Sequence, residues 1–101
     1  DFVYVEDVVQ ANLLACAAPH EAAGEAYNVA AGKRSSLNEM YAVLSDLFGK
    51  DLKPIFGPDR KGDIRHSGAD ISKIRKNLGY APEYDFEKGI KEAIQWYKEN
   101  L

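Results

Sequence analysis

Apolar residues recur along this chain in two different patterns, which predict strands and helices in turn. Residues 2–5, 26–30 and 52–56 are short runs rich in aromatic, β-branched or other apolar side chains, and each is predicted to form a strand. Pro54 has no N–H to donate to a ladder, so we expect the third strand to lie at a sheet edge.

Helical spacing predicts the intervening elements. Apolar residues recur at this spacing over residues 8–18, 37–48 and 69–79, and again in a last segment that Asp85 is expected to cap. Ser36 and Glu39 form the S-x-x-E pattern of a capping box at the start of the second helix. The resulting order is strand, helix, strand, helix, strand, loop, helix, helix. It predicts an α/β fold class, with short strands and amphipathic helices.

One long stretch, residues 57–67, has turn formers and clustered charge but no hydrophobic period. Arg60 and Asp63 lie three residues apart around a glycine, so their side chains could converge on one ligand. An arginine fork suits phosphate, and a carboxylate accepts hydrogen bonds from a diol such as a ribose. The alternative is a solvated loop with an exposed Arg–Asp ion pair, which contributes little to stability.

Composition narrows the classes of function. The chain has 101 residues, 46% of them hydrophobic and 29% charged, which is typical of one soluble domain or part of one. A net charge of −3 argues against a general nucleic-acid or membrane-surface binder, and no apolar run approaches a membrane span. The lone Cys16, expected to be a buried thiol, and only two histidines indicate no disulfide framework, no metal site and a reducing cytoplasm.

Three segments together resemble a known family. Residues 1–8 (DFVYVEDV) resemble the R-D-[FY]-[VI]-[HY]-V-x-D-[VL] segment of extended short-chain dehydrogenase/reductases, the NAD-dependent epimerase/dehydratase family. Residues 27–39 look like the family segment that begins Y-N-[VLI]-[AG]-x-G, and residues 60–82 are similar to its R-x-G-D…AD-x-[ST]-K…LG[WY]-x-P pattern. Residues 62–70 look most like UDP-sugar 4-epimerases, especially those acting on UDP-glucose or UDP-N-acetylglucosamine.

The resemblance implies roles for three residues. Arg60 would contact the UDP pyrophosphate and Asp63 the uridine ribose, while Arg34 is expected to face the sugar nucleotide. The family's Gly-rich NAD turn and catalytic Ser/Thr are not in these residues, and they would lie upstream together with its Tyr-x-x-x-Lys pair. Tyr84 and Lys88 have the spacing of that pair, but they lie at the start of a helix that Asp85 is expected to cap, and we interpret them as a chance match. We therefore assign no catalytic, cofactor-binding or metal-binding residue here. NAD is expected as the cofactor of an intact parent enzyme, and the segment alone is expected to be inactive.

Two parts are expected within the chain. Residues 1–18 would be a strand and an alanine-rich helix that pack on a missing Rossmann domain, and residues 19–101 a C-terminal sugar-nucleotide-binding domain. A chain that opens on a strand pattern suggests a segment of a longer polypeptide. Its exposed apolar helix predicts self-association of the segment.

The parent is expected to be a cytoplasmic, homodimeric isomerase. It would invert C4 of a UDP-hexose through a 4-keto intermediate, with a UDP-sugar rather than nucleic acid or membrane as its partner. Two alternatives stay open. One is another nucleotide-sugar enzyme, a 4,6-dehydratase or a decarboxylase. The other is a non-catalytic α/β binding or interaction module.

Overall fold

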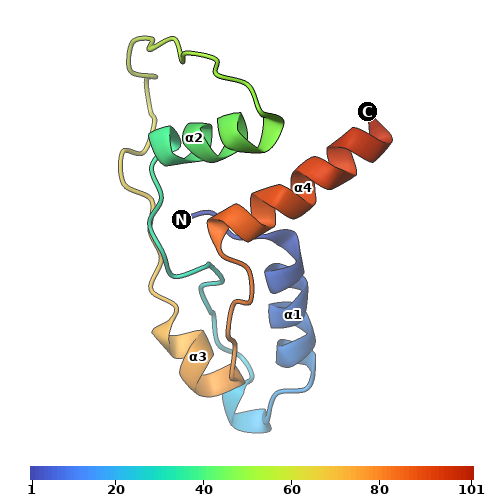
Figure 1. The fold of residues 1–101 in the computed structure, drawn as a ribbon. Helices are drawn as coiled ribbons and strands as arrows, with labels where there is room; N and C mark the ends of the chain where they lie inside the picture. Colours follow the sequence, from blue (N-terminus) through green and yellow to red (C-terminus); the bar gives the residue numbers. More distant parts are fainter.

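The computed structural model describes residues 1–101 as helices joined by long extended segments (Figure 1). The elements in chain order are α1 (Val5–Cys16), the short 3₁₀ helix η1 (His20–Ala22), α2 (Leu37–Phe48), α3 (Ser72–Leu78) and α4 (Phe86–Asn100). α1 packs against α3, and α2 packs against α4. No helix is both long enough and apolar enough to cross a membrane.

The predicted α/β fold class is wrong, because these residues contain helices and no strand. Residues 26–30 and 52–56 lie outside any helix but pair with nothing, and the first predicted strand runs directly into α1. A strand is stabilised by hydrogen bonds to a neighbouring strand. Here the 14 backbone–backbone hydrogen bonds outside the helices all join residues three to five apart, in turns and helix ends. β-Propensity identified extended backbone, but the chain supplies no partner for it.

Local signals predicted the helix ends well. Ser36 and Glu39 form the expected capping box: the Glu39 N–H donates to Ser36 Oγ at 3.1 Å and the Ser36 N–H to Glu39 Oε2 at 2.8 Å. Gly49 ends α2 in a left-handed conformation with φ 62°. Asp85 caps α4 by accepting from the Lys88 N–H at 2.7 Å. Each of these contacts is made between residues close in sequence, so the sequence alone suffices to predict it.

The core is small and lies between α1, α3 and the extended segments beside them. Its buried members are Ala11, Ala30, Ile71, Ile74 and Tyr80. The Tyr80 hydroxyl donates to the Ala30 carbonyl at 2.8 Å, which joins two segments that are 50 residues apart in the chain. This cluster therefore packs α1 and the segment around Ala30 against α3 and the segment around Tyr80.

Several side chains expected in a core are exposed. α2 has no buried residue, Leu37 at its start is 67% exposed, and Cys16 is exposed rather than buried. The radius of gyration is 16.6 Å, against about 13 Å for a compact domain of this length. Helical periodicity shows which face of a helix is apolar, but it does not show whether the chain has anything to cover that face.

Candidate functional site

The charged loop lies in the most open part of the molecule. Every residue from 50 to 70 is exposed, and Figure 1 shows this segment arching away from α2 before it descends to α3. A turn brings the backbones of Arg60 and Asp63 together, since the Asp63 N–H donates to the Arg60 carbonyl at 3.1 Å. Gly62, between them, has φ 82°, which a residue with a side chain rarely adopts.

The two side chains of this turn do not form an ion pair. The one ion pair in the structure joins Lys73 to Glu25, far from the turn in sequence. The Arg60 guanidinium and the Asp63 carboxylate therefore carry unpaired charges on a tight turn. Chemically, that arrangement can offer a cation to a phosphate and an acceptor to a hydroxyl group.

Arg34 lies at the base of the loop and not at its tip. A side chain at Gly68 would come within 3.5 Å of Arg34 Nε, so the guanidinium lies directly against this glycine. A cavity of about 310 Å³ opens here, with the charged residues Asp1, Arg34 and Asp70 and the glycine Gly68 among those that line it. Neither Arg60 nor Asp63 lines it. The structure thus places the three predicted residues on one loop and its base, with Arg34 separate from the other two.

The carboxylates of Asp1 and Asp7 bind backbone amides that are far away in the sequence, and the sequence patterns predicted neither of these long-range contacts. Asp1 accepts from the amides of residues 31–33 at 2.9, 2.8 and 3.2 Å. Asp7, only 1% exposed, accepts from the Glu83 and Tyr84 amides at 2.9 and 3.2 Å. Asp7 lies in the first turn of α1, but its carboxylate accepts from a segment 76 residues away rather than from the start of its own helix.

Tyr84 is followed four residues later by Lys88, a spacing that in other settings can lower a tyrosine pKa. Here Lys88 Nζ lies 4.3 Å from the centre of the Tyr84 ring rather than at its hydroxyl. The hydroxyl donates to Glu6 Oε2 at 2.5 Å, and this hydrogen bond, followed by burial, raises the pKa of Tyr84 to about 12. Tyr84 stays protonated at neutral pH, so it is not poised as a general base.

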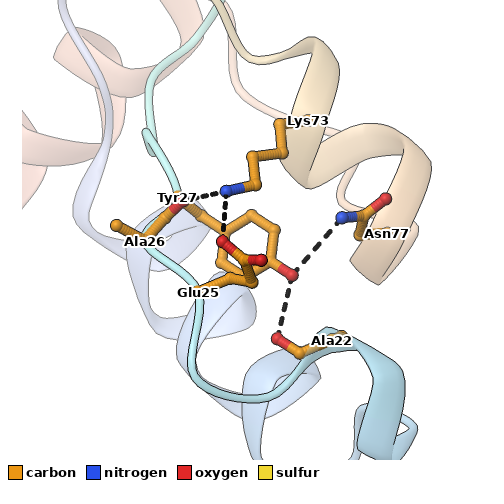
Figure 2. Close-up of polar contacts among 6 residues, drawn as sticks. All are labelled: Ala22, Glu25, Ala26, Tyr27, Lys73 and Asn77. Atoms are coloured by element: carbon orange, nitrogen blue, oxygen red, sulfur yellow. Dashed lines mark hydrogen bonds and ion pairs between the residues drawn. The ribbon is translucent and has the colours of Figure 1, made fainter.

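Lys73 of α3 holds the segment that precedes the core. Figure 2 shows its amine contacting both the Glu25 carboxylate, at 2.9 Å, and the Ala26 carbonyl, at 3.0 Å. Tyr27 lies beneath the same amine, 5.0 Å from ring centre to Nζ, and its hydroxyl donates to the Ala22 carbonyl. Lys73, the lysine of the A-D-x-S-K pattern, thus binds Glu25 and Ala26 within the chain, and its amine does not point to the charged loop.

Comparison with known proteins shows that the chain is similar in sequence to enzymes that act on nucleotide sugars. No protein-family model matches it. It is 36% identical over 100 residues to a putative UDP-glucose 4-epimerase of Methanocaldococcus jannaschii, covering 99% of this chain and 31% of that protein. It is 37% identical over 101 residues to a dTDP-glucose 4,6-dehydratase of an Actinoplanes species, covering 99% and 31%.

Solved structures show the same likeness in three dimensions. All of this chain matches 32% of a UDP-glucose 4-epimerase from Thermotoga maritima, solved with UDP-glucose, with a TM-score of 0.91 and 36% identity. It also matches 33% of MoeE5, solved with UDP-glucuronic acid and NAD, with a TM-score of 0.90 and 29% identity.

The fold is therefore that of one part of a nucleotide-sugar epimerase or dehydratase. Over its whole length the chain is similar to nucleotide-sugar epimerases and dehydratases, which is the likeness that its three sequence segments predicted. It spans about 31% of the length of the curated relatives that it matches.

Proposed function

We propose that this chain is the C-terminal, substrate-binding portion of an NAD-dependent UDP-sugar 4-epimerase. The observation that carries the proposal is the likeness of the whole chain to UDP-glucose 4-epimerases in both sequence and fold. In this proposal the intact enzyme, an isomerase, inverts the C4 configuration of a UDP-hexose through a 4-keto intermediate.

In the proposal, the loop holds the nucleotide. The Arg60 guanidinium contacts the diphosphate and the Asp63 carboxylate accepts hydrogen bonds from the uridine ribose, while Arg34 faces the sugar nucleotide from the loop base. The open turn supports this assignment, because its two charges have no partner within the chain. An arginine without a carboxylate partner retains its full capacity for a charge-assisted hydrogen bond to phosphate.

The residues of this chain do not fit NAD. A dinucleotide needs a glycine-rich turn whose amides open a helix toward its pyrophosphate. Here the start of α2 is already closed by Ser36 and by the Glu39 carboxylate, which would repel a phosphate, and Tyr4 precedes α1. We therefore assign NAD binding and the chemical steps to other parts of the polypeptide, and we propose that this segment alone is inactive.

The proposal divides the chain at residue 18. Residues 1–18 would pack on the nucleotide-binding domain, and residues 19–101 would form the sugar-nucleotide-binding part. Val5, Val9 and Leu13 lie four residues apart on α1, so they share one face, and all three are exposed. A cytoplasmic homodimer remains our proposal for the intact enzyme.

A dTDP-sugar 4,6-dehydratase is the second candidate, because a relative with that name is as similar to the chain as the epimerase relative is. The two candidates differ in the nucleotide that they bind. Competition between UDP and dTDP for the same protein separates them: a clear preference for dTDP would favour the dehydratase.

The test of the proposal is UDP binding by the longest natural polypeptide that contains these residues, measured by calorimetry. Arg60→Ala should weaken UDP binding by roughly 1.5–3 kcal/mol, the contribution of a charge-assisted hydrogen bond. Lys61→Ala is the matched control, since it removes the same charge from the same loop, and it should change affinity much less. An unchanged affinity for Arg60→Ala would contradict the phosphate role.

The same polypeptide provides a second check. Its gene should encode a glycine-rich strand-to-helix turn and a Tyr-x-x-x-Lys pair before Asp1. A start codon immediately before Asp1 would contradict the proposal that this chain is part of an epimerase.

A further inference from the structure

The Asp1 carboxylate lies near Arg34 and binds the backbone of the turn that precedes it. Its two carboxylate oxygens accept hydrogen bonds from three consecutive amides, those of residues 31–33. Gly32, with φ 74°, gives this turn the curvature that points successive N–H groups to one side. A side chain at Gly32 would meet Ile71 Cδ1 at 2.8 Å, so the turn is also pressed against the residue before α3.

The same residue contacts the base of the charged loop. The backbone nitrogen of Asp1, which is the amino-terminal group of this chain, donates to the Ser67 carbonyl at 2.5 Å. A peptide N–H in that place can make the same bond. Next along the chain, Gly68 lies against Arg34, and the Asp70 carbonyl accepts from Asn28 Nδ2 at 3.3 Å. The loop base, residues 67–70, is thus contacted at Ser67, Gly68 and Asp70.

Asp1 also leaves Arg34 without a carboxylate partner. The Asp1 carboxylate binds amides, and it forms no ion pair with Lys33 or Arg34 although all three line one cavity. A carboxylate in a salt bridge with Arg34 would reduce the attraction of that guanidinium for an anion. Here the negative charge is satisfied by the peptide dipoles, and the guanidinium keeps its donors.

We propose that Asp1 is a positioning residue for the nucleotide diphosphate. It joins the turn at residues 31–34 to the loop base at residues 67–70, and so holds Arg34 against the loop that carries Arg60 and Asp63. The diphosphate part of this inference rests on the proposed function. The joint between the two segments does not depend on any ligand.

Asp1→Asn tests the inference in the longest natural polypeptide that contains these residues. Asparagine keeps the size of the side chain but replaces one acceptor oxygen with a donor, so it cannot accept from all three amides. We expect UDP affinity to fall about tenfold, which corresponds to one weakened charge-assisted contact. Hydrogen–deuterium exchange should become faster both at residues 31–33 and at residues 67–70.

Two further variants distinguish positioning from a general loss of structure. If Asp1 acts through Arg34, Asp1→Asn should weaken UDP binding much less when Arg34 is already alanine. Asp7→Asn is the matched control, because Asp7 also binds backbone amides, but those of Glu83 and Tyr84. It should lower the midpoint of denaturation and leave the UDP affinity of the folded protein within about twofold of wild type.

The outcomes separate this inference from the proposed function. If the wild-type protein binds UDP and Asp1→Asn binds it equally well, the positioning role is overturned and the proposed function stands. If the wild-type protein does not bind UDP, the proposed function fails. The diphosphate role of Asp1 then fails with it, and exchange at residues 67–70 alone decides whether Asp1 joins the two segments.

Discussion

The two halves of this molecule differ in how their side chains are held. Around α1 and α3, contacts join residues far apart in the chain: Tyr80 to Ala30, Asp7 to Glu83, and Lys73 to Glu25. From residue 50 to residue 70, every residue is exposed and the one internal backbone bond is the turn from Asp63 to Arg60. The packed half determines its own geometry, whereas the charged side chains of Arg60 and Asp63 and the exposed apolar side chains of Ile55, Phe56 and Ile64 have no partner within these 101 residues.

The largest test of this difference compares one residue type in the two halves. Ile74 is 1% exposed and Ile55 is 98% exposed. Ile74→Ala should lower the free energy of unfolding by about 2–5 kcal/mol, because it removes buried methyl groups and leaves a cavity. Ile55→Ala should change it by less than about 0.5 kcal/mol. Urea denaturation followed by circular dichroism measures both, and equal effects would show that the packed half is not the stable part.

The next test concerns the exposed apolar stripe of α1, formed by Val5, Val9 and Leu13, which no other part of the chain covers. We expect the 101-residue chain to self-associate through such surfaces, and Leu13→Glu to shift it toward monomer because it places a charge on the stripe. Gln10→Glu adds the same charge to the same helix outside the stripe and should have little effect. Light scattering over a range of protein concentrations measures the molar mass of each variant, and a monodisperse wild-type monomer would overturn the expectation.

The smallest expected effect lies where the loop joins α3. The Ser72 hydroxyl and amide both donate to the Asp70 carboxylate, and these bonds hold the pKa of Asp70 below its ordinary value of 3.8. The stabilisation is therefore present above that ordinary value and is lost as the pH falls through the lowered pKa. An NMR titration should show the carboxyl titrating below 3.8, and Ser72→Ala should move the midpoint upward. A midpoint that does not move would contradict the role of Ser72.

The sequence predicted what depends on neighbours in the chain. The capping box at Ser36 and the cap at Asp85 are both present, because each involves atoms within a few residues of one another. The likeness to nucleotide-sugar epimerases and dehydratases was also predicted correctly, since the residues that carry it lie in a recognisable order along the chain. The roles of Arg60, Asp63 and Arg34 remain predictions.

Only the tertiary structure determined which predicted strands would pair and which side chains would form long-range hydrogen bonds. The segments with strand propensity stayed unpaired, because a ladder needs a second strand at hydrogen-bonding distance. Nothing in the sequence distinguishes Asp1 and Asp7 from other acidic residues. Their carboxylates join distant segments only because folding brings the amides of residues 31–33 and 83–84 to them. A carboxylate's charge is a property of the residue, but the donors that satisfy it come from distant parts of the chain.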